Sequence, residues 1–152
     1  MVREDMVFAG QNLVGREEVI GFIASAAQKA GLLSNKADFI AAVFRREQEI
    51  STSIGHGIAI PHGKTEAVRE AFISYVGVTE AFEWDPVTKD LVKGVFLIGV
   101  PEKNTDKIHL KAISEISKKL INEEFRTQLF CCTQGKEAFE LLDAINAGIQ
   151  GK

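Results

Sequence analysis

A mostly apolar segment, Leu91–Val100, restricts the possible folds of this chain more than any other stretch of its sequence. It lacks the alternation of apolar and polar residues that a half-exposed strand shows, and such a run is typical of a strand buried on both faces. Ala71–Val78, rich in β-branched and aromatic residues, predicts a second long strand. A sheet that contains a fully buried strand needs helices on both faces, so we expect an α/β fold with the sheet between helical layers.

The other elements are predicted from the helical spacing of apolar residues and from the positions of Gly and Pro. The second predicted helix is capped by Ser34 or Asn35 and ends at the pair Arg45-Arg46. In full, we expect a short apolar opening at Val7 and Phe8, helices over Val19–Ala30, Asn35–Arg46, Thr105–Leu120, Glu123–Cys131 and Lys136–Ile145, a short strand at Ile58–Ile60, and an excursion over Glu80–Asp90 with a turn at Asp85-Pro86.

The overall composition indicates a single soluble domain. The chain has 152 residues, with 18 basic and 21 acidic side chains and a net charge of -3. This length suits one globular domain, so we assign residues 1–152 to a single domain. The mild negative charge gives no reason to expect nucleic acid as a partner, and no apolar run reaches the roughly 20 residues of a membrane-spanning helix. We therefore expect a cytoplasmic protein with no direct membrane insertion.

The two cysteines, Cys131 and Cys132, are adjacent in a predicted helix. A disulfide between neighbouring residues is strained, and a cytoplasmic protein keeps its thiols reduced. We therefore expect both cysteines to be reduced thiols in the core.

The candidates for chemistry are the histidines, because the sequence lacks the glycine-rich phosphate loops, the zinc signature and the nucleophile elbow of other enzyme classes. His62 lies between Pro61 and Gly63, at the end of the predicted short strand. Proline fixes its own backbone and glycine permits close approach by another group, so this imidazole is predicted to be presented at the surface. A neutral imidazole is a nucleophile toward phosphorus, but spacing alone equally allows a histidine that only caps a loop.

Three further residues are weaker candidates. His109 lies in the opening turn of a predicted helix, where it is either a core histidine or a neighbour of a bound anion at the helix N-terminus. Arg46 ends the second predicted helix, where it either compensates the helix dipole or contacts a phosphoryl group. His56 lies between two glycines, and we expect it to be exposed or to support the site indirectly.

The segment Ser53–Lys64, which reads S-I-G-H-G-I-A-I-P-H-G-K, resembles the active-site segment of a known family. The family is the IIA components of the bacterial phosphoenolpyruvate-dependent sugar phosphotransferase system (PTS), of the fructose/mannitol class. The resemblance extends over nearly the whole chain. Arg45-Arg46-Glu47 lies at the corresponding distance upstream, and Asp106–Leu110 opens the corresponding downstream helix.

The resemblance implies a phosphotransferase component with a three-layer α/β/α sandwich around a mixed sheet. It places the phosphorylated histidine at His62, with the phosphoryl group on Nε2, the second active-site histidine at His109 and the phosphate-contacting arginine at Arg46. The phosphoryl group would arrive from phospho-HPr and pass to a IIB component, which is coupled to a membrane component, IIC, for sugar uptake. The donor and the acceptor are side chains, so no cofactor or metal is expected.

Two alternatives remain at this point. A nitrogen-related regulatory branch of the family has nearly the same segment and acts by binding other proteins; His56 is consistent with that branch, whereas Lys64 fits the transport branch slightly better. A metal site made of His56, His62 and His109 is the second, less favoured alternative, because no metal-ligand spacing is present. The sequence names neither the sugar nor the oligomeric state. Met1 and the short polar tail favour a free subunit over part of a fusion.

Overall fold

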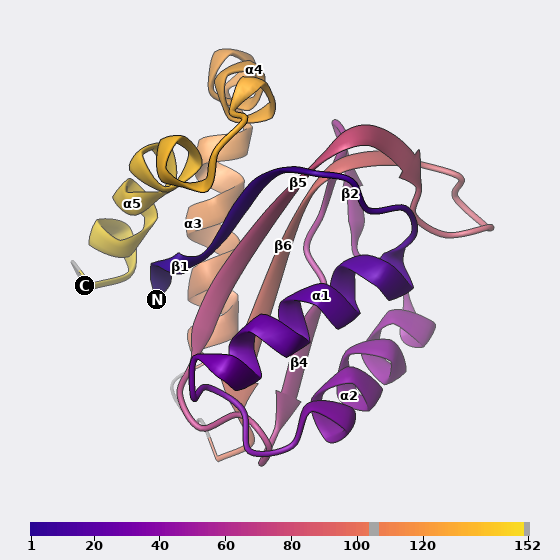
Figure 1. The fold of residues 1–152 in the computed structure, drawn as a ribbon, viewed down its shortest axis with the longest axis vertical. Coiled ribbons are helices and arrows are strands. Elements are labelled where there is room, and N and C mark those ends of the chain that lie inside the picture. Colours follow the sequence, from indigo (N-terminus) through magenta and orange to yellow (C-terminus); the bar gives the residue numbers. More distant parts are fainter. Residues whose placement is uncertain (104–106, 151–152) are drawn as a thin grey trace.

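A six-stranded mixed sheet with helices on both faces forms the protein in the computed structural model, which describes residues 1–103 and 107–150 (Figure 1). The elements follow one another in the order β1 (Val2–Gln11), α1 (Arg16–Lys29), α2 (Lys36–Glu49), β2 (Ser53–Gly55), β3 (Ile58–Ala59), β4 (His62–Thr65), β5 (Phe72–Glu83), β6 (Leu91–Pro101), α3 (Ile108–Leu120), α4 (Glu123–Cys131) and α5 (Gly135–Gln150).

The sheet has the strand order β1-β5-β6-β3-β2, and β4 also pairs with β6. The strands β1 and β5 are parallel, β5 and β6 are antiparallel, and both β3 and β4 run parallel to β6. The strand β3 pairs with Gly94 and Val95, while β4 pairs farther along β6, from Ile98 to Pro101. Two short strands therefore follow one another along the same edge of β6, with Ile60 and Pro61 between them and His62 at the start of β4.

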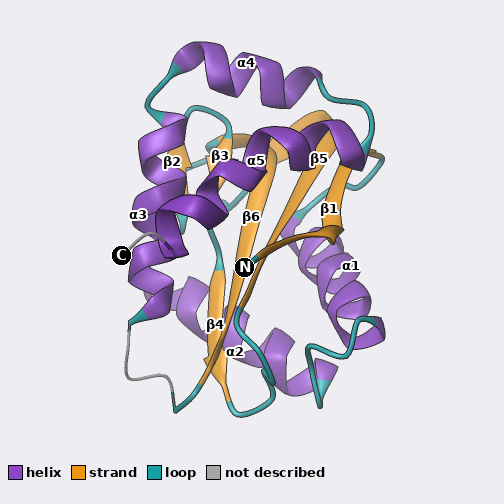
Figure 2. Ribbon diagram, turned by 90° about the vertical axis from the view of Figure 1, so that its left-hand side faces the viewer, coloured by secondary structure: helices purple, strands orange, loops and turns teal. Residues whose placement is uncertain are grey.

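The residues of β6 alternate between two hydrophobic cores. Val95 and Leu97 belong to the core that α1 and α2 cover, whereas Phe96 and Ile98 belong to the core that α3 and α5 cover. All four side chains are completely buried. The expected burial of this strand on both faces is confirmed, and so is the three-layer α/β/α architecture (Figure 2).

Several element boundaries differ from those expected. The strand β1 covers Val2–Gln11 rather than only the apolar opening, because parallel pairing with β5 continues past its charged residues. Both α2 and β5 are longer than predicted, ending at Glu49 and Glu83. The cap is confirmed, since Asn35 Oδ1 accepts a hydrogen bond from the Asp38 amide at 3.0 Å. The predicted start of a helix at Thr105 lies outside the described residues, and α3 is seen from Ile108.

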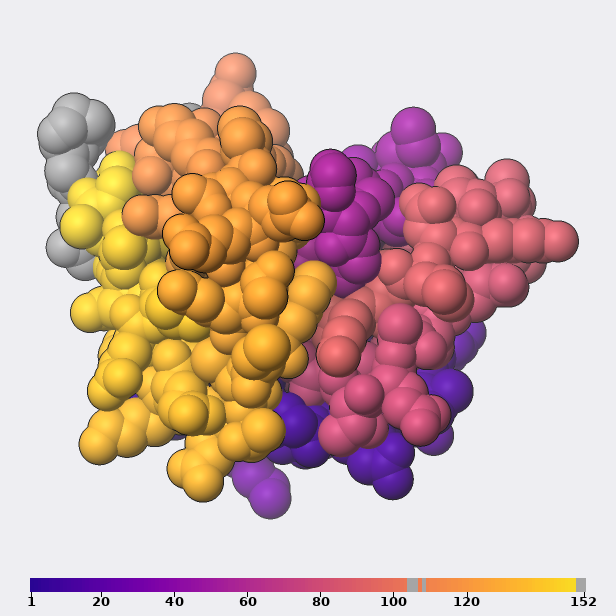
Figure 3. Space-filling model, turned by 90° about the horizontal axis from the view of Figure 1, so that it is seen from above, coloured from indigo at the N-terminus to yellow at the C-terminus, as the bar shows by residue number. Residues whose placement is uncertain are grey.

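The expectation that both cysteines lie in the core is wrong for Cys131, whereas Cys132 packs partly buried against the core that α3 and α5 cover. Cys131 is exposed and Cys132 is half-buried, and both are free thiols. The reason is the phase of α4: Leu129 is its fully buried residue, and a position two residues later lies about 200° around the helix, on the outer side. Figure 3 shows α4 and α5, in orange and yellow, forming one side of the molecule next to the strands in magenta and pink.

Within residues 1–103 and 107–150, none of the helices combines the length and the apolar character that crossing a bilayer demands.

Candidate functional site

The segment Ser53–Lys64 begins with a tight hairpin between β2 and β3. Gly55 pairs with Ile58, and the two turn residues, His56 and Gly57, have φ angles of 59° and 80°. Positive φ at both central residues is the geometry that matches the twist of a two-residue hairpin. His56 is exposed at the tip of this hairpin, as expected, and its position is explained by the turn.

His62 is the first residue of β4 and does not end β3, so the predicted simple turn after Ile60 is replaced by a second short strand. Its backbone pairs with Ile98 of β6. A Cβ atom on Gly63 would lie 2.8 Å from Val43 Cγ2 of α2. The close approach that Gly63 permits is therefore made by the protein's own helix, and His62 is half-buried rather than fully presented at the surface.

The His62 ring is held by a backbone carbonyl. Its Nδ1 atom lies 3.3 Å from the carbonyl oxygen of Ile60. A carbonyl can only accept a hydrogen bond, so the neutral ring carries its proton on Nδ1 in this contact. The lone pair is then on Nε2, which is the nitrogen available to react.

His109 lies beside His62 although the two are far apart in the sequence. The ring centroids are 5.9 Å apart and the ring planes differ by 28°, a stacked arrangement. His109 is the second residue of α3, so it stands in the first turn of that helix, where backbone N–H groups favour an anion. Its Nδ1 atom is buried without a hydrogen-bond partner in the part of the chain that the structure describes.

Arg46 lies in the last turn of α2, and its charge acts on His62. Its Nη1 atom donates a hydrogen bond to the carbonyl oxygen of Ile50 at 3.0 Å, which ties the guanidinium to the end of its own helix. It is among the charges that lower the pKa of His62. The structure thus brings the two predicted histidines and Arg46 into one neighbourhood and leaves His56 at the hairpin tip. In the described ranges, no three His, Cys, Asp or Glu side chains form a group that could hold a metal.

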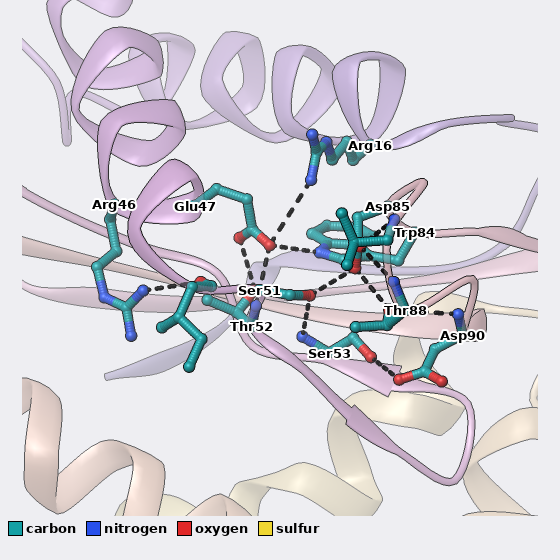
Figure 4. A network of polar contacts seen from close by, with 12 residues as sticks. Arg16, Arg46, Glu47, Ser51, Thr52, Ser53, Trp84, Asp85, Thr88 and Asp90 are labelled. Atoms are coloured by element: carbon teal, nitrogen blue, oxygen red, sulfur yellow. Dashed lines mark hydrogen bonds and ion pairs between the residues drawn. The ribbon is translucent and has the colours of Figure 1, made fainter.

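Glu47 was not predicted as part of this region, yet its carboxylate organises the chain that leads into the site (Figure 4). Its side chain is 1% exposed. The carboxylate accepts hydrogen bonds from the Thr52 amide at 2.9 Å, from Thr52 Oγ1 at 2.7 Å and from Trp84 Nε1 at 2.8 Å. Arg16 Nη1 lies 3.8 Å away and supplies positive charge. A signal was present in the sequence, because Glu47 continues the helical stripe of Phe39 and Val43.

A second set of polar contacts connects the same loop to the turn between β5 and β6 (Figure 4). Ser51 Oγ donates to Asp85 at 2.7 Å, and Ser53 Oγ donates to Asp90. Asp85 also accepts hydrogen bonds from the Val87 and Thr88 amides and from Thr88 Oγ1, so it closes the turn itself. The loop from α2 to β2 is therefore fixed from both sides, and the hairpin that precedes His62 starts from a fixed position.

The surroundings lower the pKa of both histidines. Burial lowers the pKa of His62 most, and Arg46 and His109 add to this, while the Ile60 carbonyl and Glu47 oppose it. Burial also lowers the pKa of His109, with Lys64 and Lys107 contributing. Both rings are therefore neutral near pH 7, which keeps Nε2 of His62 nucleophilic.

We expect both histidines to titrate below pH 6.5, the ordinary value, in an NMR titration of their ring resonances. Because the unfolded chain then binds protons at a higher pH than the folded chain, the free energy of unfolding should fall as the pH is lowered through 6.5. Midpoints at or above pH 6.5 for His62 would contradict the assigned environment.

The geometry can now be compared with known proteins. The family model described as "Phosphoenolpyruvate-dependent sugar phosphotransferase system, EIIA 2" matches residues 1–145. The chain belongs to this family. It is a phosphotransfer component of the sugar PTS, and the resemblance to its fructose/mannitol class is confirmed.

Two curated relatives carry names from the sugar PTS. The 2-O-alpha-mannosyl-D-glycerate-specific EIIABC component of Escherichia coli is 28% identical over 94% of this chain, which spans only 22% of that protein's length. The fructose-specific EIIA component of Haloferax volcanii is 32% identical over 75% of this chain and 73% of its own length.

A solved structure confirms the fold of the EIIA chain. The crystal structure of the nitrogen regulatory protein IIA-Ntr from Neisseria meningitidis superposes with a TM-score of 0.81. The match covers 93% of this chain and 95% of that one at 23% sequence identity. At this identity, the likeness concerns the fold alone.

Proposed function

We propose that this EIIA chain carries a phosphoryl group on Nε2 of His62, accepting it from phospho-HPr and donating it to a IIB component. The IIB component would be coupled to a IIC membrane component that takes up and phosphorylates a sugar of the fructose/mannitol type. The names of the curated relatives, among them a fructose-specific EIIA component and an EIIABC protein, support this assignment.

The observation that carries the proposal is the contact between His62 Nδ1 and the Ile60 carbonyl oxygen, at 3.3 Å. It selects the tautomer whose nucleophilic nitrogen is Nε2. As Nε2 forms its bond to phosphorus, the bond between phosphorus and the donor nitrogen breaks, and the donor imidazole leaves with that electron pair. The proton of His62 stays on Nδ1, where the carbonyl stabilises the positive charge that develops on the ring.

The neighbours of His62 supply the charge that such a transfer needs. A phosphoryl group carries negative charge on several oxygens, and its transfer depends on positioning and electrostatic stabilisation more than on proton transfer. We assign this stabilisation to Arg46, to His109 and to the backbone N–H groups at the start of α3. Lys64 and Lys107, which act on the His109 ring, make the surroundings more positive.

The site is also suited to partners that bind and leave quickly. Leu110 follows His109 in the sequence and is 52% exposed, so an apolar side chain lies next to the reactive pair. A docking surface shared by a donor and an acceptor should be small, on the order of 1,200 Å² or less in total. We propose HPr and the IIB component as the two proteins that use it in turn.

The proposal is tested by incubating the protein with phosphoenolpyruvate, enzyme I and HPr and measuring its intact mass. We expect the gain of one phosphoryl group that is lost in acid, and a ³¹P NMR resonance typical of an Nε2-linked phosphohistidine. His56→Asn is the matched control, because asparagine tolerates the left-handed turn position and the variant should be labelled like the wild type. No uptake by the folded wild type, or an Nδ1-linked product, would overturn the proposal.

Transfer from the labelled protein to a purified IIB component separates the transport role from the regulatory alternative. We expect the label to move to IIB within seconds to minutes and to regenerate the unmodified chain. A protein that is phosphorylated but passes nothing to IIB from fructose- or mannitol-type systems would instead fit the regulatory branch.

A further inference from the structure

A cavity at the opposite end of β3 from His62 is distinct from the phosphoryl site. It lies between the C-terminal end of α4 and the strands β5 and β6, along the boundary between the orange and the pink residues in Figure 3. Its volume is about 210 Å³. A cavity of roughly 150 Å³ is large enough for benzene, so this one can take a compound built on a six-membered ring. It is lined by Gly10, Tyr75, Gly77, Val78, Thr79, Lys93, Leu129, Phe130, Cys131, Cys132 and Thr133.

At the wall of this cavity, the Tyr75 hydroxyl is a buried donor without a partner in the described part of the chain. Tyr75 is 1% exposed, and its hydroxyl has no hydrogen-bond partner within residues 1–103 and 107–150. Burial raises the pKa of Tyr75, with Cys132 contributing, so the hydroxyl stays protonated and can donate. Leaving a buried donor without an acceptor costs stability, and phenylalanine would fill the same space without that cost. A tyrosine at this position is explained by an acceptor that comes from outside the chain.

Two glycines make room for this hydroxyl. Gly77 and Gly94 are cross-strand partners in β5 and β6. A Cβ atom on either would lie 3.0 Å from the Tyr75 hydroxyl oxygen. On Gly94 it would also lie 3.0 Å from the Phe130 ring of α4. Any larger side chain at this cross-strand pair would therefore push against the hydroxyl and the wall of the cavity.

Lys93 supplies a positive charge to the same cavity. The amides of Lys93 and Gly94 both donate to the Gly57 carbonyl oxygen, at 2.8 and 3.0 Å, which is the pattern of a β-bulge. Val92 and Val95 belong to the same core although residues three apart in a regular strand face opposite sides. The alternation of side chains along β6 is therefore interrupted between them, and this slip is where Lys93 lies. The slip allows Lys93 to line the cavity on the α4 side. Its ammonium group forms no ion pair or hydrogen bond with the residues described, and none of the residues that line the cavity is acidic.

We propose that this cavity binds a small organic carboxylate, with the anionic head held by the Tyr75 hydroxyl and the Lys93 ammonium. Two donors match the two oxygens of a carboxylate, whereas a phosphate would present more oxygens and a second charge. The body of the ligand lies against Phe130, Leu129 and Val78. These apolar side chains favour a compound with a compact apolar ring or chain.

The test is an NMR titration of the ¹⁵N-labelled protein with sodium benzoate, using benzamide as a neutral probe of the same shape and sodium chloride as the salt control. We expect saturable shifts of the amides of Gly77, Lys93, Gly94 and Thr133 with benzoate and at least tenfold weaker binding of benzamide. In Tyr75→Phe, benzoate should bind about tenfold more weakly or worse, while the melting temperature is equal to or above that of the wild type.

Lys93→Gln gives a second, independent readout, because this half-buried residue can be replaced without disturbing the core. We expect the preference for benzoate over benzamide to disappear in this variant. The matched control is Lys29→Gln on α1, on the other face of the sheet, which should bind benzoate like the wild type. Shifts that do not saturate, or equal benzoate binding by the wild type, Tyr75→Phe and Lys93→Gln, would overturn the proposal.

Discussion

Replacement of His62 by alanine should abolish phosphoryl uptake from phospho-HPr, with a loss of more than about 1,000-fold in the rate of labelling. The physical reason is that the proposed nucleophile is Nε2 of His62. The guanidinium of Arg46 is always protonated and cannot replace it, and we expect His109, whose Nδ1 atom is buried, to stabilise the group rather than to accept it. The measurement is intact mass after incubation with phosphoenolpyruvate, enzyme I and HPr, as for the wild type.

The fold of the His62→Ala variant should survive, because the backbone of residue 62 pairs with Ile98 whatever its side chain. We expect the free energy of unfolding to change by no more than about 1 kcal/mol. His109→Ala is the informative comparison: it should slow labelling without abolishing it, because the proposed role of His109 is only to stabilise the transferred group. Acid-labile labelling that persists at the wild-type rate in His62→Ala would show that another residue is the acceptor.

Replacement of Glu47 by alanine should produce the largest loss of stability of any single change in this region, about 3–5 kcal/mol. The change removes the acceptor for the Thr52 amide, the Thr52 hydroxyl and the Trp84 indole N–H, all of them buried. Each donor would then lie in the core without a partner, and Arg16 would lose its counter-charge. Urea unfolding followed by circular dichroism measures the effect as a lower midpoint.

Glu49→Ala is the matched control for this experiment. Glu49 is the last residue of the same helix, carries the same charge and is exposed, so its loss should change the free energy of unfolding by no more than about 0.5 kcal/mol. If Glu47→Ala unfolds within 1 kcal/mol of this control, the network does not hold the loop that leads to His62. Glu47→Gln should be intermediate, because an amide oxygen can accept from some of the same donors.

The layered architecture could be predicted because it depends on short-range patterns. The mostly apolar run of β6 requires cover on both faces, and the cap at Asn35 requires only an acceptor three residues before an amide. The strands β2 and β4 were missed for the opposite reason. Each is four residues long or less, and each forms because β3 or β6 offers an edge, a condition that no local pattern reveals.

The candidate site, too, was predicted only in part from the sequence. His62 stands out in the sequence because Pro61 and Gly63 surround it within a specific motif. The role predicted for Gly63, to present His62 at the surface, was wrong. The group that lies close to Gly63 is the side chain of Val43 on α2. Glu47 was overlooked because a glutamate at a helix end is ordinarily exposed, and only the indole of Trp84 and the Thr52 backbone make its burial favourable.

The sequence by itself determined the layered fold and singled out His62 as the candidate for phosphoryl transfer, because both follow from residue order within a few turns or strands. Only the tertiary structure decided which nitrogen of His62 is free, that the His109 ring stacks on it at 5.9 Å, and that Lys93 is turned toward a cavity. These features join residues that are distant along the chain. They are set by how strands align on β6 and how helices pack across it, and that alignment is a property of the whole core.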